Sequence, residues 1–467
     1  MPYTPRVERA RSIWAVLVAA LRGDVDGIAT GPLGRAIPLL AIPMALEMAG
    51  EALFALVDVF FVGHLGATAV ATVGLTESMM ALLYALAFGL AMPATAMVSR
   101  RVGEGDLEEA GATAAQAMWA AIAVGALVSL LGAFAPQLLT LMGGTAEVVR
   151  EGRTFTAIML GASPLVILLF VGGGALRGAG DAAGAMRALW IANGINIALD
   201  PCLILGLGPF PELGLTGAAV ATVVGRSAGV VYQVWRLSRA RSVSIRGRWG
   251  LRLDIIRRLF RLSVGGTAQH LVETGSWVAV VRVLAELGSV AVAGYTVTMR
   301  LVIFTLLPVW GFSNATATLV GQSLGANDPA RAERAVWLSG SFASVILAIV
   351  SLAFLLAPRP LAALFTDDAA VVDVAGEGLF IIAFGYFFYG WVMVCQQAFN
   401  GAGDTTTPAW INVACFWCLL IPLAWILANP VGLRESGVFI AIATGYSVSA
   451  IVSVVLVRRG RWKLAQA

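Results

Sequence analysis

Charged residues are scarce in this chain of 467 residues: 12% of them are Asp, Glu, Lys or Arg, whereas 59% are hydrophobic. A soluble protein of this size needs a charged surface around its core. The composition therefore excludes a water-soluble globular fold and indicates that lipid covers most of the surface. Backbone groups in lipid must pair within helices or closed barrels, and the alternating pattern of a barrel is absent. We therefore predict an all-α membrane protein.

Cysteine and histidine are also rare, with four and two residues. All four cysteines lie in apolar runs, which excludes a disulfide framework, and the CxxC pair Cys415 and Cys418 has no second pair nearby. His64 and His270 are too scattered for a metal site, although His270, one turn from Glu273, is a candidate for proton transfer. HExxH, GxSxG and DDxxD motifs are absent, so we expect neither a cofactor nor enzyme activity.

Long apolar runs follow one another from about residue 34 to about residue 457. About 20 residues suffice to cross a hydrocarbon core of about 30 Å, and each run between polar breaks reaches that length. We expect twelve transmembrane helices, at 34–62, 70–98, 110–136, 153–174, 185–206, 214–236, 258–286, 291–321, 333–358, 376–399, 408–428 and 436–457.

Basic residues gather on one side of these predicted helices. The loops of the other side hold Arg150, Arg153, Arg359 and Arg434, whereas nine arginines lie within 236–261 alone. This asymmetry places both termini in the cytosol and the chain in the plasma membrane. A nucleic-acid patch is the rival interpretation of the basic cluster. Because predicted membrane helices flank it on both sides, we expect a topology signal that contacts membrane lipid, and no nucleic acid partner.

The sequence also repeats itself, with six predicted helices in each half. Three blocks recur in the same order at an offset of 222 or 223 residues: LGATAVATVG (65–74) with LGSVAVAG (287–294), MVSRRVGEGDLEEA (97–110) with LVGQSLGANDPARA (319–332), and LRGAGD (176–181) with FNGAGD (399–404). An even number of helices returns the chain to its starting side, so we expect two parallel repeats that form two lobes.

The repeat and the charge pattern predict the domain boundaries. Asp181 and Asp404 end the GAGD blocks, in which glycine suits a helix exit and aspartate suits the cap of the next helix. We expect an amino-terminal cytosolic segment, a first lobe, a basic cytosolic linker, a second lobe and a cytosolic tail at 1–32, 33–236, 237–257, 258–457 and 458–467.

Comparison of the two halves separates residues that serve the fold from residues that serve function. Three costly polar residues of the first half align with apolar ones in the second: Asp58 with Val280, Asn196 with Leu419 and Asp200 with Leu423. Asn196 and Asp200 are four residues apart, so both lie on one side of their helix. A charge in mid-bilayer costs about 3 kcal/mol or more and usually marks a transport pathway. The alternative is a structural role, with Asp58 hydrated at a helix end and Asp200 bonded to a neighbouring helix.

Pro201 follows Asp200 in the same predicted helix. Proline removes a backbone donor, which frees a carbonyl one turn earlier and lets the helix bend. Two carboxylates, an amide and this carbonyl are oxygen ligands suited to Na⁺, and the carboxylates can instead hold a proton. We therefore predict coupling to H⁺ or Na⁺ with Pro201 as the conformational hinge.

Glutamates occupy matching positions in the first helix of both halves. Glu273 aligns with Glu51, and Glu47 lies one turn before Glu51 on the same helix face. These positions predict a secondary polar cavity. Arg282 and Arg300, in or near apolar runs, are expected to pair with the glutamates or to anchor the helices at the membrane interface.

The motifs VDVFFVGHLG, NIALDP, GAAVAT (217–222) and VGQSLGAND, together with the GAGD turns, resemble the multidrug and toxic compound extrusion (MATE) family from about Leu33 onward. The resemblance implies two six-helix lobes in a V shape. It also implies cation-coupled export of organic, often cationic, compounds. The expected partner is an organic cation or another amphipathic small molecule, and we expect a monomer.

The resemblance also implies residue roles. In the DinF-like branch the cation site lies in the first lobe and corresponds here to Asp58, Asn196 and Asp200, with Thr222 on the sixth helix. NorM-like members use a glutamate on the seventh helix and an aspartate on the tenth.

Glu273 matches the NorM-like glutamate, but Tyr389 stands at the position of the aspartate. The second-lobe site is therefore incomplete, which favours the first lobe and the DinF-like branch.

Three other functions remain as alternatives. A flippase for lipid-linked precursors would share the helix layout but needs a more basic cavity. A membrane-embedded enzyme needs a catalytic motif, and a channel fits poorly with a two-lobed repeat that buries titratable groups. The sequence decides neither the substrate nor the choice between Na⁺ and H⁺.

Overall fold

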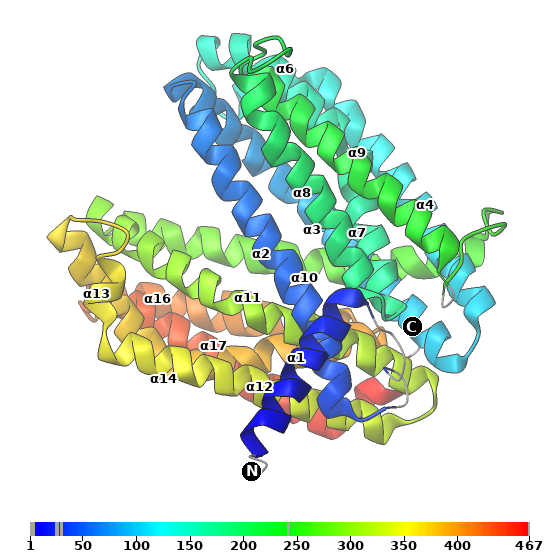
Figure 1. Cartoon of the computed structure of the whole chain (residues 1–467). Helices are drawn as coiled ribbons and strands as arrows, with labels where there is room; N and C mark the ends of the chain where they lie inside the picture. Colours follow the sequence, from blue (N-terminus) through cyan, green and yellow to red (C-terminus); the bar gives the residue numbers. More distant parts are fainter. Residues whose placement is uncertain (1–4, 24–27, 29–30, 241–242, 466–467) are drawn as a thin grey trace. The chain divides into compact units, whose positions relative to one another are not determined.

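The computed structural model describes residues 5–23, 28, 31–240 and 243–465. Parts of the predicted amino-terminal segment, linker and tail, namely 1–4, 24–27, 29–30, 241–242 and 466–467, lie outside the described residues. The described chain is helical throughout and contains no β-strand (Figure 1). The predicted all-α class is therefore confirmed.

The chain divides into two compact units, residues 1–26 with 46–267, and residues 27–45 with 268–467. Two helices pass from one unit to the other, α2 (Leu33–Gly63) and α10 (Leu253–Ala285). Unit 1 also holds α1 (Pro5–Arg22), α3 (Ala67–Glu104), α4 (Leu107–Ser129), η1 (Leu130–Phe134), α5 (Ala135–Leu141), α6 (Ala146–Gly161), α7 (Ser163–Gly178), α8 (Ala182–Ile204) and α9 (Leu215–Arg239). Unit 2 holds α11 (Ser289–Gly325), α12 (Pro329–Leu356), α13 (Pro358–Ala362), α14 (Ala369–Ala402), α15 (Thr406–Asn412), η2 (Val413–Leu420), α16 (Ile421–Ala428), α17 (Arg434–Arg459) and η3 (Arg461–Leu464).

Each of the twelve predicted spans coincides with one helix or with consecutive helical segments. The third runs through α4, η1 and α5, the fourth through α6 and α7, and the eleventh through α15, the π-helical η2 and α16. Proline near the start of α5, α7 and α16 explains these interruptions, because it cannot donate to the preceding turn.

Nine spans among the described residues are long and apolar enough to cross a membrane by length and composition alone. The other three lie on α2, α8 and α10, which have 31, 23 and 33 residues. These same helices carry Asp58, Asp200 and Glu273. Polarity is thus concentrated in the helices that sequence comparison marks as functional.

The repeated aspartates cap helices, as predicted for the GAGD turns. Asp181 Oδ1 accepts a hydrogen bond from the backbone N–H of Gly184 at 3.0 Å, and Asp404 Oδ1 accepts one from Thr407 at 3.1 Å. The preceding glycines, Gly180 and Gly403, have left-handed φ values of 88° and 91°. This backbone conformation requires glycine, so these blocks serve the fold.

The unit boundary differs from the boundary that the repeat predicts. The repeat places the whole first helix in the first lobe, whereas residues 27–45 group with unit 2. Close packing accounts for this difference, because a Cβ added at Gly311 on α11 would collide with the carbonyl oxygen of Ala41 and approach Ala45 at 2.9 Å.

The predicted linker, 237–257, is held against α4 of unit 1. The Gln116 side chain donates to the Gly250 carbonyl at 2.9 Å and accepts from the Arg252 N–H at 3.0 Å. The Trp119 indole donates to the Trp249 carbonyl at 3.1 Å. These bonds anchor the described part of the linker to unit 1 and fix where α10 begins.

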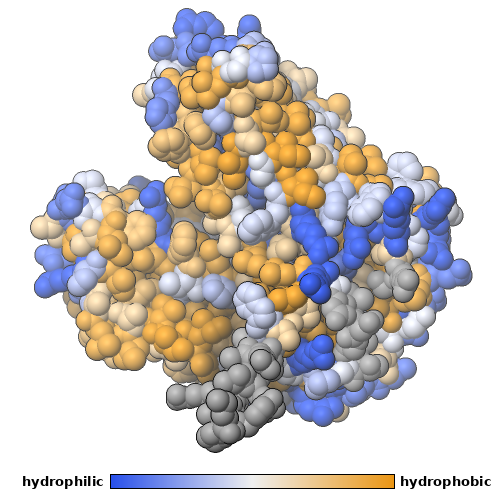
Figure 2. Space-filling view, viewed as in Figure 1, coloured by the Kyte–Doolittle hydropathy of each residue, from blue (hydrophilic) through white to orange (hydrophobic). Residues whose placement is uncertain are grey.

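Apolar side chains dominate much of the visible surface, whereas hydrophilic residues gather in separate patches (Figure 2). Leu56, Leu127, Val231, Ile349 and Phe384 are among the large hydrophobic residues exposed by more than half. A water-soluble protein avoids extended apolar surface of this kind. The surface therefore suits contact with lipid.

Glycine brings α8 and α9 of unit 1 into close contact (Figure 1). A Cβ at Gly225 would collide with the carbonyl oxygen of Ala192, and one at Gly229 would lie 2.9 Å from the carbonyl oxygen of Ala188. Helices in lipid associate through such small-residue contacts because no hydrophobic effect drives them together.

We predict that Gly225→Ala lowers the stability of the protein by about 1–3 kcal/mol, because α8 and α9 must separate to admit the methyl group. Gly194→Ala is the matched control on α8, since a Cβ there meets nothing within 4 Å. Alanine also favours helix by up to about 1 kcal/mol, so the control is expected to be neutral or stabilising. The midpoint of thermal unfolding in detergent is measured for both variants. Equal midpoints for Gly225→Ala and Gly194→Ala would contradict the packing argument.

Candidate functional site

Four helices of unit 1, α2, α3, α8 and α9, bring polar residues together. Asp200 lies on α8 and is fully buried, with an exposed fraction of 0%. Neither of its carboxylate oxygens has a hydrogen-bond partner among the described residues. Burying an unpaired carboxylate is costly, which makes Asp200 a candidate for binding a cation or a proton.

Asn196 lies one turn before Asp200 and bonds to α9. Its Nδ2 donates to Thr222 Oγ1 at 3.0 Å, and Thr222 Oγ1 donates to the carbonyl oxygen of Ala218, also at 3.0 Å. Asn196 Oδ1 is buried and has no partner in the described part of the chain. The structure thus places Thr222 beside Asn196, where the family resemblance implies it, and leaves one amide oxygen free to act as a ligand.

Asp58 on α2 is partly buried, and a negative charge there opposes a negative charge on Asp200. Glu77 on α3 interacts with Asp58 in the same way. Sequence reasoning missed Glu77, although the comparison of halves could have found it, because the aligned residue at an offset of 222 is Met299. Three carboxylates of the first half, Asp58, Glu77 and Asp200, thus align with apolar residues in the second half.

Two glutamates of α2 are neutralised by arginines. Glu47 accepts from Arg177 Nη1 at 2.6 Å, and Glu51 accepts from Arg226 Nη2 at 2.9 Å. The prediction that Arg282 or Arg300 pairs with such glutamates is wrong. Arg282 Nη2 lies 3.7 Å from Glu286 Oε1, just beyond the end of α10, and Arg300 is exposed.

Sequence reasoning also missed Asn193, Arg177 and Arg226. Asn193 Nδ2 donates to the second oxygen of Glu51, at 3.0 Å. These partners lie 130 to 175 residues from the glutamates in sequence, so no helical spacing links them. The arginines were hidden because they lie on helices that otherwise read as apolar.

Glu273 and His270 lie together on α10 in unit 2, with His270 Nδ1 at 4.0 Å from Glu273 Oε2. Tyr389 is buried, stacks on Tyr446 with ring centroids 3.9 Å apart, and its hydroxyl has no partner in the described chain. Trp277, one turn after Glu273 on α10, also lies against Tyr446, with ring centroids 6.3 Å apart. Glu273 therefore faces aromatic residues where the family pattern has an aspartate.

Pro201 lies inside α8, which ends at Ile204, and follows the buried Asp200 directly. The proline nitrogen cannot donate to the carbonyl of Ile197, whereas the Pro201 carbonyl accepts from Leu205 at 3.2 Å. The weak point of α8 therefore lies one turn from its end and beside the unpaired carboxylate.

The oxygen-rich part of the cluster suits a monovalent ion or a proton. No group of three or more His, Cys, Asp or Glu side chains in the described residues is arranged to hold a metal ion. Asp58, Asp200 and Asn196 Oδ1 offer two carboxylates and one neutral oxygen. This set resembles no high-charge metal site but can accept Na⁺ or protons.

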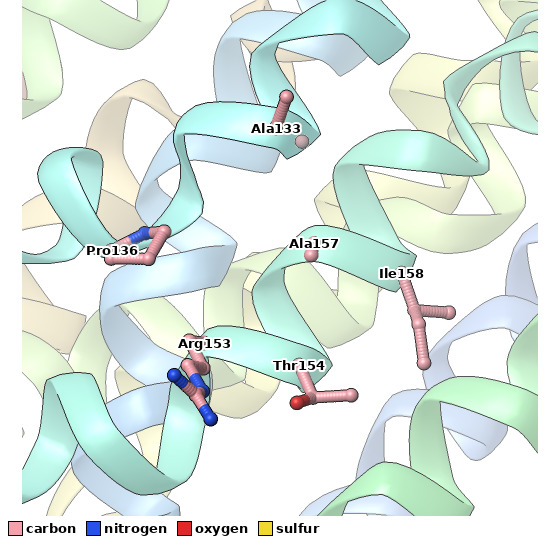
Figure 3. Close-up of a pocket in the computed structure, with 7 residues that line it drawn as sticks. Ala133, Pro136, Arg153, Thr154, Ala157 and Ile158 are labelled. Carbon is pink, nitrogen blue, oxygen red and sulfur yellow. The ribbon is translucent and has the colours of Figure 1, made fainter.

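A shallow pocket of about 400 Å³ lies elsewhere in unit 1, between η1, α5 and α6 (Figure 3). Pro136, Arg153, Thr154 and Ile158 are among its lining residues, and none of the seven lining residues belongs to the predicted site. The pocket therefore adds nothing to the cluster around Asp200.

Comparison with known proteins supports the same family that the motifs indicate. The MatE family matches residues 43–202 and 268–426, one segment in each half. An FAD transporter from Shewanella oneidensis is 26% identical over 86% of this chain and 89% of its own length. A probable multidrug resistance protein NorM from Thermotoga maritima is 24% identical over 91% of this chain and 92% of its own.

Solved structures of transporters have the same fold as this chain over nearly its whole length. A MATE family multidrug resistance transporter in an outward-facing conformation has a TM-score of 0.87 and 25% identity, over 95% of this chain and 99% of that one. A transporter of the MOP superfamily from Pyrococcus furiosus, described as having a binding pocket of reverse polarity, has a TM-score of 0.86 and 26% identity over the same shares.

These matches span both halves and nearly the full length of the relatives. They also agree with twelve membrane-spanning helices in two parallel six-helix repeats and with a transporter rather than an enzyme. The chain belongs to the MatE family of multi-pass membrane transporters.

Proposed function

We propose that this chain is a secondary active exporter that couples inward movement of H⁺ or Na⁺ to efflux of organic, amphipathic compounds. The unpaired and fully buried carboxylate of Asp200, beside Asp58 and Asn196, carries this proposal. A cation that binds there neutralises repelling charges. It can therefore favour one conformation over another, which is the requirement for coupling.

The proposal includes the expected setting of the protein. The chain acts as a monomer in the cytoplasmic membrane, with both termini in the cytosol and its apolar surface against lipid. The basic residues of the linker support this orientation, since arginines concentrate on the cytosolic side of membrane proteins. The DinF-like branch is proposed on the same residues, Asp58, Asn196, Asp200 and Thr222.

The flippase remains the second candidate. Acidic residues outnumber basic ones in the cluster of unit 1, where Asp58, Glu77 and Asp200 have no arginine partner among the described ion pairs. A site for lipid-linked phosphates would require the opposite balance. Organic compounds with a cationic part therefore fit better. The name of one relative, a probable multidrug resistance protein, agrees with an organic small-molecule cargo.

Everted membrane vesicles with a fluorescent organic cation test the proposal directly. A pH gradient and a Na⁺ gradient are imposed separately, and at least one is expected to drive uptake into the vesicles. Uptake that follows neither gradient, or that requires ATP, would contradict secondary active export.

We predict that Asp58→Asn and Asp200→Asn each abolish gradient-driven export while the protein remains folded, because each removes an ionisable ligand of one shared site. The double variant is expected to be no worse than either single variant. Neighbouring residues of one site are not additive, whereas independent residues are. Export rates in vesicles with matched protein levels measure this, and wild-type rates in either single variant would refute the assignment.

Glu273→Gln is expected to reduce coupled export less than Asp200→Asn, by under tenfold, because the aspartate expected beside it is replaced by Tyr389. The same vesicle assay provides the comparison. Complete loss in Glu273→Gln with full export in Asp200→Asn would move the cation site to unit 2.

Pro201→Ala is expected to slow turnover by several-fold with little change in substrate affinity. Restoring the backbone donor to Ile197 stiffens α8 beside Asp200. Binding and export are measured in the same membranes. If affinity falls while turnover per bound substrate stays constant, Pro201 shapes a binding surface instead of acting as a hinge.

A further inference from the structure

Arg226 is a buried arginine that the coupling mechanism does not use. Its side chain is 4% exposed and lies on α9. A guanidinium inside a membrane-spanning helix is costly unless several of its five donors are satisfied. The contacts of its guanidinium group therefore show which of these donors are satisfied.

The contacts of Arg226 are asymmetric. Nη2 donates to Glu51 Oε1 at 2.9 Å, and the guanidinium carbon lies 5.5 Å from the centre of the Phe54 ring. Arginine and carboxylate often form two parallel bonds. Here Asn193 takes the second oxygen of Glu51, at 3.0 Å. Nη1 is left buried with no hydrogen-bond partner in the described chain.

Comparison of the two halves indicates that Arg226 is not part of the packing that both halves share. Gly217 and Gly225 on α9 pack on the backbone of α8, whereas on α17 Gly437 packs on Leu427 and Ala428 and Gly445 packs on the Leu420 side chain. The two glycines of each helix are eight residues apart and superpose at an offset of 220 residues. The same offset aligns Arg226 with Tyr446. The second half therefore packs an aromatic ring where the first half holds a charge.

The ion pair of Arg226 and Glu51 borders the exposed surface, although Nη1 itself is buried. Glu51 is 26% exposed, so the pair lies at the edge of the buried cluster. Glu51 and Asp58 are seven residues apart on α2 and therefore lie on one face of that helix. A simple anion would be repelled by these carboxylates, whereas a simple cation would leave Nη1 unsatisfied.

We propose that Arg226 Nη1 binds the acidic group, a carboxylate or a phosphate, of an amphoteric substrate whose cationic part lies toward Asp58 and Glu77. This inference rests on the proposed export function and names its substrate class. Glu51, itself bonded to Asn193, holds Nη2 of the guanidinium, so Nη1 has no partner among the described residues. Charge-assisted bonds of this kind add geometric specificity, so the acidic group determines which organic cations bind well.

Three dyes with one scaffold test the proposal. The first dye, rhodamine B, carries a carboxylate and a cationic xanthene. The second, its ethyl ester, has no acidic group. In the third, the carboxylate of rhodamine B is converted to a tertiary amide that carries a phosphate monoester, so phosphate takes the place of carboxylate as the acidic group. Their dissociation constants are measured by fluorescence anisotropy with the full chain in lipid nanodiscs, at one pH and one salt concentration. At least one acidic dye is expected to bind tenfold or more tightly than the ester.

The paired variant Arg226→Met with Glu51→Gln removes both charges together, which avoids an isolated buried carboxylate. The ratio of ester to acid dissociation constants is expected to fall from ten or more to about one. Arg226→Lys keeps a charge for Glu51 but lacks the second arm, and it is expected to lower the ratio at least threefold. This variant decides the question if the paired variant does not fold.

Arg236→Met with Asp181→Asn is the matched control, because it removes another ion pair of unit 1, with a 2.6 Å contact, and leaves asparagine to cap α8. Its ratio is expected to equal that of the wild type. Equal binding of all three dyes by the wild type, or a preference that survives in both Arg226 variants, would overturn the proposal. A preference for only one acid identifies carboxylate or phosphate as the group recognised.

Export of the same dyes separates this proposal from the function on which it rests. If the acidic dye binds preferentially through Arg226 but no gradient drives its transport, the exporter is contradicted and recognition by Arg226 is supported. If the acidic dyes and the ester are exported at equal rates, by the wild type and by the Arg226 variants alike, the export function is supported and recognition by Arg226 is contradicted.

Discussion

A charge inside a membrane-spanning helix must be neutralised, and the interior of unit 1 is organised around this constraint. Glu47 and Glu51 are neutralised permanently by arginines from α7 and α9, at 2.6 and 2.9 Å. Asp200 has no such partner, although it is the most deeply buried of these acids. The two ion pairs hold the helices together, whereas the unpaired Asp200 is the group at which we propose that a mobile cation binds. The same helices can therefore be held together by ion pairs and still change conformation when a cation binds at Asp200, as proposed.

The close approach of α8 and α9 makes this arrangement possible. Gly217, Gly225 and Gly229 let α9 lie directly on the backbone of α8. The approach brings Thr222 within 3.0 Å of Asn196 and places Arg226 over α2. In lipid this contact depends on shape rather than on exclusion of water. A larger residue at Gly225 would therefore press on Asn196, whose Cβ would lie 3.2 Å from the added Cβ, as well as on the backbone of α8.

Periodicity and the internal repeat predicted much of this structure from sequence. Apolar runs located all twelve spans, since only long helices satisfy the backbone in lipid. The GAGD blocks predicted the caps at Asp181 and Asp404 because capping is local. Alignment of the halves identified Asp58, Asn196 and Asp200, because a costly residue present in one half alone requires a reason.

What the sequence could not predict depends on contacts between distant helices. Arg177 and Arg226 are 130 and 175 residues from Glu47 and Glu51, so only the three-dimensional register pairs them. The division of α2 between the units likewise depends on packing at Gly311 rather than on the repeat. Glu77 was within reach of the sequence comparison and was missed because its span otherwise reads as uniformly apolar.

The central claim is that Asp58 and Asp200 form one cation site whose occupancy alters substrate binding. The most direct measurement is the dissociation constant of a fluorescent substrate in nanodiscs as a function of pH and of Na⁺ concentration. It is made for the wild type and for the Asp58→Asn, Asp200→Asn double variant. The account predicts that affinity in the wild type changes at least fivefold with one of the two ions and that this dependence disappears in the double variant. The same ion dependence in both proteins would contradict it.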